Sequence, residues 1–255
     1  MYLYSLIMET LFIGKNYLKF DEIPSTNSWL MERLSVQNFP EGTLVFAKYQ
    51  SIGKGQRCSS WTAEQSSSLT FSVLLKPTFL PISNAYDLSI CIALALHDCL
   101  NELRPGFTIK WPNDIYFEDK KVAGILIENQ LNKTSYQNAV VGIGLNVNQK
   151  SFVNLPNAIS LKQILGIKFP VEKVLNRLCE TIEARYLQLR ANKYEQLKQA
   201  YLKSMYRYNE VRQFRSKNKE FTATIIGVLR SGRLVLVLQN GEKCDFDIKE
   251  IEFIN

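Results

Sequence analysis

The amino-acid sequence predicts an α+β protein, with a larger domain built on a mixed β-sheet and a small all-β domain after it. Two features of the chain lead to this prediction. Before residue 206, the segments with strand composition cluster and the helical segments flank them, without strict alternation of the two. After residue 206, helical periodicity stops and short strand-like runs follow one another. We therefore place the domains at 1–206 and 207–255.

Regular structure in the first domain is expected to include a capped helix that begins near residue 26. Ser25, Thr26 and Asn27 precede apolar residues, and such side chains accept hydrogen bonds from the first N–H groups of a helix. Further helices are expected where apolar residues recur at helical spacing, over 87–103, 171–189 and 194–204. Strand composition predicts strands at 43–49, 69–75, 107–110, 114–117, 122–129 and 136–148.

The second domain is expected to consist of short strands joined by tight turns. Ser231-Gly232 and Asn240-Gly241 are typical of hairpin turns. The predicted strands are 210–215, 221–229, 234–238, 243–246 and 251–254. Because so many short strands fill so short a segment, we expect a small barrel.

Composition narrows the class of protein. The chain has 255 residues, of which 46% are hydrophobic, and a formal net charge of +7, which suits a nucleotide, an acidic partner or nucleic acid. Five cysteines without a Cys-x-x-Cys pair, and a single histidine, argue against a zinc site and against Ser-His-Asp chemistry. The apolar N-terminus is too short to span a bilayer and lacks the features of a signal peptide, so we expect a cytoplasmic protein without membrane association. Met1 and Met8 both remain possible starts.

The segment Lys110-Trp111-Pro112-Asn113-Asp114 is predicted to form a stiff corner between two strands. Pro112 cannot donate a hydrogen bond to a sheet and moves Trp111 away from helical angles. Lys110 ends the preceding strand, where its ammonium can reach a cleft and pair with phosphate or carboxylate. The alternative is a surface lysine beside an ordinary turn.

Two glycine-containing segments offer exposed backbone for a ligand. The loop 53–61 combines glycines with Lys54 and Arg57, although it lacks the pattern of a P-loop or of a dinucleotide fingerprint. In the strand 141–148, Gly142 and Gly144 leave one face bare, and Asn146 on that face suits an adenine edge. The alternatives are a flexible hairpin loop and a core strand softened by glycine.

Together these segments closely resemble the biotin protein ligase family. The resemblance extends over residues 20–255, and its most specific part is 110–128, which ends in Lys-x-Ala-Gly-Ile-Leu-x-Glu. It implies a catalytic domain of the class II aminoacyl-tRNA synthetase-like, biotin/lipoate ligase type and an SH3-like barrel. It also implies that biotin and MgATP form biotinyl-5′-AMP, and that biotin is then transferred to a lysine of the biotin carboxyl carrier protein domain of a biotin-dependent carboxylase.

The resemblance further implies roles for single residues. Lys110 is expected to be the key catalytic residue, with Lys54 and Arg57 assisting it. The implied biotin-binding residues are Ser25, Thr26, Asn27, Gln50, Gly53, Lys110 and Gly124. The implied ATP-binding residues are Lys54, Gly55, Arg57, Trp61, Asn113, Lys121 and Asn146. Metal ligands are left open, because phosphates can supply most of the coordination of Mg²⁺.

Two departures from the family pattern affect these expectations. In the loop, Gln56, Cys58 and Ser59 replace an arginine, a glycine and an arginine, so Lys54 and Arg57 are expected to supply its charge. Only 24 residues precede Ser25, which predicts a ligase without a DNA-binding domain. A monomer or homodimer is expected.

Two other functions are weighed against a biotin ligase. A lipoate or octanoate ligase or transferase would share the fold, but the 110–128 block argues against it. A basic nucleic-acid-binding module would be expected to show a basic stripe interleaved with aromatic residues, which this sequence lacks.

Overall fold

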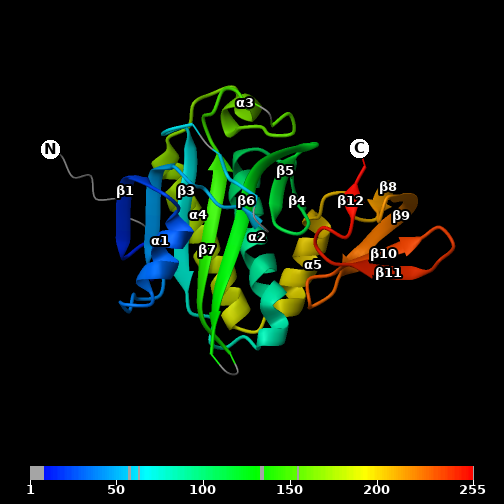
Figure 1. Ribbon diagram of the computed structural model, residues 1–255, viewed down its shortest axis with the longest axis horizontal. Coiled ribbons are helices and arrows are strands. Elements are labelled where there is room, and N and C mark those ends of the chain that lie inside the picture. Colours follow the sequence, from blue (N-terminus) through cyan, green and yellow to red (C-terminus); the bar gives the residue numbers. More distant parts are fainter. Residues whose placement is uncertain (1–8, 57–58, 63, 133–134, 154, 255) are drawn as a thin grey trace.

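The computed structural model describes residues 9–56, 59–62, 64–132, 135–153 and 155–254. A seven-stranded mixed sheet, in the order β1-β2-β3-β7-β6-β5-β4, forms the centre of the molecule, and a second sheet lies beside it at the C-terminal end (Figure 1). Its strands are β1 (Tyr17–Ile23), β2 (Leu44–Gln50), β3 (Ser68–Leu75), β4 (Phe107–Lys110), β5 (Asp114–Phe117), β6 (Lys120–Leu131) and β7 (Tyr136–Asn146). The pair β1–β2 is parallel, and the other pairs are antiparallel.

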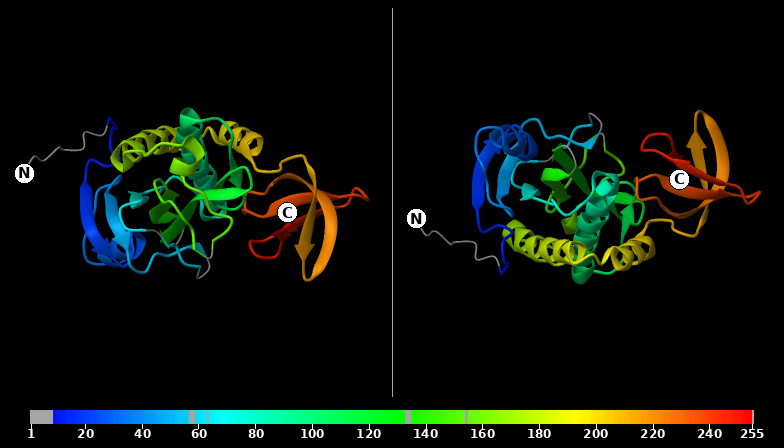
Figure 2. Two further views of the ribbon diagram at one scale, coloured as in Figure 1. Left: turned by 90° about the horizontal axis from the view of Figure 1, so that it is seen from above. Right: turned by 90° about the horizontal axis from the view of Figure 1, so that it is seen from below.

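Helices cover the two faces of this sheet unequally. The helix α1 packs on β2, β3 and β7, whereas α2 and α4 pack on the other face (Figure 2). The helices are α1 (Thr26–Arg33), α2 (Ala85–Leu103), α3 (Leu161–Leu165), α4 (Val171–Arg190) and α5 (Tyr194–Ser204), with a short 3₁₀ turn η2 (Ile82–Asn84) before α2. Every residue of β3 is buried, as expected for a central strand covered on both faces. Among the described residues, no helix has the length and apolarity to cross a membrane.

Three cysteines lie in the buried parts of α2 and α4. Cys91 and Cys99 of α2 and Cys179 of α4 are buried free thiols. Burial raises the pKa of each of these thiols, which removes their reactivity at neutral pH. They therefore serve as small core residues.

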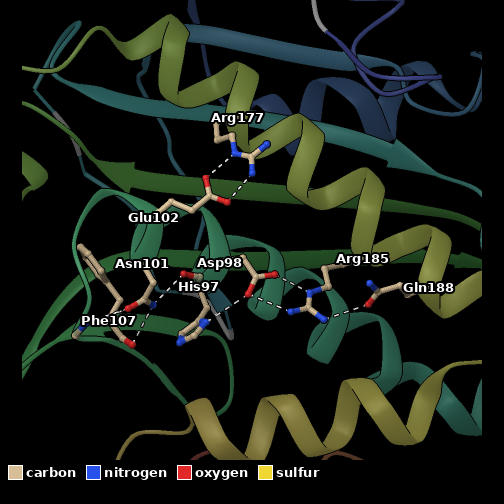
Figure 3. A network of polar contacts seen from close by, with 9 residues as sticks. His97, Asp98, Asn101, Glu102, Phe107, Arg177, Arg185 and Gln188 are labelled. Atoms are coloured by element: carbon tan, nitrogen blue, oxygen red, sulfur yellow. Dashed lines mark hydrogen bonds and ion pairs between the residues drawn. The ribbon is translucent and has the colours of Figure 1, made fainter.

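Charged residues fasten α2 to α4 along their polar sides (Figure 3). Arg185 donates to both carboxylate oxygens of Asp98, over 2.6 and 3.1 Å, and Arg177 donates to both oxygens of Glu102, over 2.6 and 2.5 Å. Two-point pairs of this kind fix geometry more than single ion pairs do. They therefore set the angle between the two helices, while the apolar core supplies most of the stability.

A carboxylate on α4 holds the start of the described chain. Glu183, which is buried, accepts hydrogen bonds from the backbone N–H groups of Leu11 (2.6 Å), Phe12 (2.8 Å) and Ile13 (3.1 Å). Ile13 is fully buried in the main core. The carboxylate thus substitutes for the strand or helix partners that this segment lacks.

Replacing Glu183 with alanine is expected to lower the free energy of unfolding by about 3 kcal/mol, because buried N–H groups would lose a charged acceptor. Urea unfolding measures the change. Glu180→Ala is the matched control, since Glu180 on the same helix pairs with Arg177 at the surface and should cost less than about 1 kcal/mol. Equal losses in the two variants would contradict the anchoring role of Glu183.

Two elements lie outside the sequence-based prediction. The strand β1 is the edge of the sheet, and its Asp21 and Glu22 are exposed, so its composition is not that of a buried strand. The helix α3 has only five residues, too few to show a helical period. It is fixed instead by a capping box between Ser160 and Gln163 and by Gly166 at φ +74°.

The C-terminal unit contains the five predicted strands, but their sheet stays open. The strands are β8 (Val211–Ser216), β9 (Lys219–Val228), β10 (Leu234–Leu238), β11 (Lys243–Phe246) and β12 (Glu252–Phe253). Their order is β11-β10-β9-β8-β12, so β11 and β12 are edges and the expected barrel is not closed in the described residues. With two residues, β12 pairs with β8 and is too short to reach β11 as well. The predicted domain boundary at 206 falls in the connection between α5 and β8.

Candidate functional site

A pocket opens on the face of the sheet that carries α1. Strands β6 and β7 form its floor, the N-terminus of α1 and the end of β2 form one end, and the loop before β3 covers it. The corner between β4 and β5 closes the other end. Its lining residues include Ser25, Thr26, Asn27, Gln50, Lys54, Gly55, Trp61, Asn113, Asp114, Lys121, Gly124, Gly142 and Gly144.

The start of α1 makes one end of the pocket a fixed polar surface. Ser25 is the N-cap, as predicted, and its hydroxyl accepts from the N–H of Ser28. The backbone N–H and the hydroxyl of Thr26 both donate to Gln50 Oε1, over 2.7 and 3.0 Å. Asn27 Nδ2 donates to Glu128 Oε2 over 2.8 Å. These hydrogen bonds fix the orientation of Thr26, Asn27 and Gln50, whose polar groups line the pocket.

A buried hydroxyl and a bare strand complete this end. Ser72 Oγ lies 2.7 Å from Thr26 Oγ1 and 2.6 Å from Asn27 Oδ1. Gly142 faces Asn27 so closely that a Cβ there would lie 2.3 Å from Asn27 Oδ1. Only glycine fits at that position, which explains the first of the two glycines in β7.

The second glycine of β7 makes room for an indole ring. A Cβ on Gly144 would lie 2.4 Å from the Trp61 ring. The Trp61 Nε1 is buried and has no hydrogen-bond partner in the described part of the chain, which leaves a donor for a ligand. The backbone at these glycines is bare, as predicted, and at Gly144 the Trp61 ring fills the space beside it.

A lysine and an aspartate lie together at the other end of the pocket. Lys121 Nζ is 2.7 Å from Asp114 Oδ1. Burial raises the pKa of the Asp114 carboxyl, and the ammonium groups of Lys121 and Lys110 act in the opposite direction. Lys121 Nζ also lies 5.9 Å from the centre of the Trp61 ring. The ion pair thus places the Lys121 ammonium beside the Trp61 ring.

A second hollow continues from the first past Trp61 and Lys121, which line both. Apart from these, its walls are mainly apolar and include Tyr116, Phe152 and Leu155. Asn146, the last residue of β7, and Asn157 are the amide-bearing residues of its lining. The Nδ2 of Asn146 donates to the Ile159 carbonyl over 3.2 Å. A flat apolar group with one polar edge suits this hollow.

Lys110 occupies a different place from the one expected. It ends β4 as predicted, and it lines a hollow against the C-terminal sheet that shares Asp114 with the first pocket. Its Nζ lies 3.2 Å from the Tyr116 hydroxyl, and 4.5 and 5.0 Å from the ring centres of Tyr116 and Phe253. Burial lowers the pKa of this ammonium, with a smaller opposing effect from Asp114. Aromatic rings from both units thus surround the ammonium, while Asp114 and Lys121 of the pocket lining act on its charge.

The loop over the pocket is closed by its own backbone. Trp61 N donates to the Gly53 carbonyl over 2.9 Å, and Gly55 N donates to the Ser59 carbonyl over 2.7 Å. Gly53 supports Trp61 from outside the lining, whereas Lys54 and Gly55 line the pocket. Arg57 and Cys58, named from the sequence, lie outside the described residues.

Three contributors to the site were missed by sequence reasoning. Asp114 stands in the motif that was singled out, but no role was assigned to it. Gly142 was recognised as bare backbone and not as a neighbour of Asn27. Ser72 could have been found as a polar residue within an otherwise apolar strand.

Comparisons with known proteins found relatives in sequence and in structure. Residues 19–146 match the model of the "Biotin/lipoate A/B protein ligase family". The bifunctional ligase/repressor BirA of Bacillus spizizenii is 30% identical over 243 residues, covering 92% of this chain and 74% of that protein. A biotin–[acetyl-CoA-carboxylase] ligase of Mycobacterium tuberculosis is 32% identical over 65% of this chain and 62% of its own. The structure of biotin protein ligase from Aquifex aeolicus in complex with biotin and ATP matches with a TM-score of 0.77 and 27% identity, covering 93% of this chain and 98% of that one.

Proposed function

Because the chain belongs to the biotin/lipoate A/B protein ligase family, we propose that it is a biotin protein ligase that uses ATP to activate biotin and then transfers biotin to a carrier lysine. One observation carries this proposal. A single pocket joins the polar start of α1 to Lys121 across the bare backbone of β7. In the matching Aquifex aeolicus structure, biotin and ATP are bound together. The protein is therefore a ligase with two small substrates that meet in one cleft.

The polar end of the pocket is the place for the biotin ring. Thr26, Asn27 and Gln50 present donors and acceptors that a urea-like group can match. Ser25 caps the helix that carries Thr26 and Asn27, whereas Gln50 ends β2. Gly124 adds no side chain to the pocket floor. A ligand that starts at this end extends along β7, so its carboxylate arrives at Lys121.

The first step brings two negative groups together. An oxygen of the biotin carboxylate attacks the α-phosphorus of ATP, an O–P bond forms, and the bond to pyrophosphate breaks. Positioning and charge neutralisation are the main requirements of such a step. Lys121 supplies the positive charge, and Asp114 holds it in place at 2.7 Å. We propose Lys121 for this role beside Lys110, the lysine that the family resemblance implies and whose charge is influenced by Asp114 and Lys121.

The nucleotide is expected to lie between the covering loop and the second hollow. Asn146 faces the hollow that suits an adenine ring, and Trp61 separates that hollow from the biotin end. Lys54 and Gly55 in the loop, together with Asn113 at the corner, line the phosphate side. Arg57 keeps its predicted role as an additional cation.

Mg²⁺ fits this site as part of the nucleotide. Among the described residues, no group of three or more His, Cys, Asp or Glu side chains gathers to hold a metal ion. Asp114 is the carboxylate of the pocket lining, and it already pairs with Lys121. Mg²⁺ commonly keeps several waters and binds through substrate phosphates, so it would neutralise phosphate charge without a protein cage.

The second step transfers biotin to a protein. A carrier lysine amine attacks the acyl carbon of the adenylate, an amide bond forms, and AMP leaves as the amine loses a proton. The Mycobacterium tuberculosis relative is named for acetyl-CoA carboxylase, which makes the carrier domain of a biotin-dependent carboxylase the expected partner. A cytoplasmic location, a monomeric or dimeric state and the absence of DNA binding stay predictions.

The direct test is to incubate the protein with ATP, Mg²⁺ and labelled biotin and to identify biotinyl-5′-AMP by mass spectrometry. Pyrophosphate exchange into ATP should depend on biotin. Exchange that proceeds equally well without biotin would refute the proposal.

Biotin should be strongly preferred over lipoate, because the fixed hydrogen-bonding groups around Asn27 suit a urea ring and lipoate lacks one. A site built for hydrogen bonding rejects ligands without the partner groups by large factors. Competition in the exchange assay measures the preference. Lipoate that competes at the same concentration as biotin would favour a lipoate ligase instead.

A further inference from the structure

The C-terminal sheet touches the corner of the pocket through one indole. Trp111 is 4% exposed, and its Nε1 donates to the Gly232 carbonyl over 2.8 Å. Gly232 lies in the turn between β9 and β10 at φ +91°. A Cβ at Gly232 would lie 2.7 Å from Tyr86, so the turn packs tightly against α2. Figure 1 shows the second sheet beside the β4–β5 end of the first.

The same turn is held at a second place. Arg230 Nε lies 3.5 Å from Asp87 Oδ2, and its guanidinium lies 4.3 Å from the centre of the Tyr194 ring. Asp87 is buried at the start of α2 and Tyr194 begins α5. The position of the Gly232 carbonyl is therefore set by two helices of the larger unit.

The corner next to Trp111 leads directly into the pocket. Asn113 Nδ2 donates to the Ile125 carbonyl over 2.7 Å, and Ile125 N donates to the Asn113 carbonyl over 3.0 Å. Asp114, the next residue, holds Lys121. The corner 111–114 thus lies between the C-terminal turn and the nucleotide end of the pocket. The biotin end is built on other elements, α1 and β2.

Resting on the proposed ligase function, we propose that Trp111 and Gly232 are positioning residues for the adenylation step. Their hydrogen bond makes the C-terminal sheet part of the support for Asn113 and Asp114, and through Asp114 for Lys121. Loosening this contact should impair the use of ATP while biotin binding stays intact. If the contact were purely structural, breaking it would lower the free energy of unfolding and would affect ATP and biotin alike.

The test replaces the indole by a ring that cannot donate. For Trp111→Phe, we expect kcat/KM for ATP in biotin-dependent pyrophosphate exchange to fall about tenfold, whereas the Kd of biotin measured without ATP stays within about twofold. Phe246→Leu is the matched control, because Phe246 packs on Phe221 inside the same sheet. That control should lose stability and keep its exchange kinetics.

A second variant changes Gly232, the residue whose carbonyl accepts the Trp111 hydrogen bond. Gly232→Ala strains the turn and meets Tyr86, so it should reproduce the Trp111→Phe profile, and the double variant should cost no more than the larger single effect. Should either protein fail to fold, Arg230→Gln at the half-exposed end of the turn is expected to raise KM for ATP about threefold.

Three results would overturn the inference: wild-type exchange kinetics in Trp111→Phe, an equal loss of biotin affinity, or an unchanged KM for ATP in Arg230→Gln. Failure of the proposed function looks different, because the wild-type protein itself would then show no biotin-dependent exchange.

Discussion

Replacing Lys121 with alanine is expected to slow formation of biotinyl-5′-AMP by about 100- to 1000-fold, the usual effect of removing one group that stabilises developing charge. Lys121 is the lysine at the meeting point of the two hollows, 2.7 Å from the Asp114 carboxylate. Without it, the carboxylate of one substrate approaches the α-phosphate of the other without the ammonium that Asp114 positions. Single-turnover formation of the adenylate measures the loss.

Alanine variants of two other lysines serve as comparisons for Lys121→Ala. Lys120→Ala removes the neighbouring exposed lysine and should leave the rate unchanged. Lys110→Ala should slow the reaction less than about tenfold, since the Lys110 ammonium lies among Tyr116, Tyr206 and Phe253 outside the pocket. A larger loss for Lys110→Ala than for Lys121→Ala would restore the assignment made from the sequence.

Replacing Gly142 with alanine is expected to weaken biotin binding by about 100-fold, which corresponds to about 3 kcal/mol. The added methyl would lie 2.3 Å from Asn27 Oδ1 and 2.8 Å from its Cγ, so the amide must move. Moving it breaks its contacts with Ser72 and Glu128 and leaves buried polar groups without partners. Calorimetric titration with biotin measures the change.

The control for Gly142→Ala is an alanine placed in another strand. Gly227 lies in β9, and a Cβ there would meet nothing within 4 Å. Gly227→Ala should bind biotin as the wild type does. Normal biotin affinity in Gly142→Ala would show that the start of α1 is not the biotin end of the pocket.

Long elements with a clear period were predictable from the sequence. The helix α2 buries a continuous apolar face, and its spacing alone indicated a helix from residue 87 onward. The N-cap at Ser25 followed from local chemistry, because a side-chain oxygen before an apolar run satisfies the first N–H groups of a helix. In contrast, the edge strand β1 is defined by its pairing with β2, and its own residues show no strand-like hydrophobic pattern.

The surroundings of Lys110 and Lys121 could not be predicted from the neighbouring residues. Lys110 and Lys121 stand near the same corner, and each could face a cleft when only strand alternation is considered. The aromatic rings that surround Lys110 include Phe253, which lies more than half of the chain away in sequence. A contact of this kind depends on how the C-terminal sheet packs, and neighbouring residues carry no information about it.

By itself, the sequence determined the chemical groups and the segments that carry them: the cap at 25–27, the corner at 110–114, the glycines of β7 and the strands after residue 206. These follow from short-range sterics and hydrogen bonding, which neighbouring residues fix. Only the tertiary structure decided that Lys121, held by Asp114, lines the pocket, that Trp61 fills the space beside Gly144, and that the C-terminal sheet stays open. Each of these depends on packing between segments distant in the chain, where the volume left by one element decides the place of another.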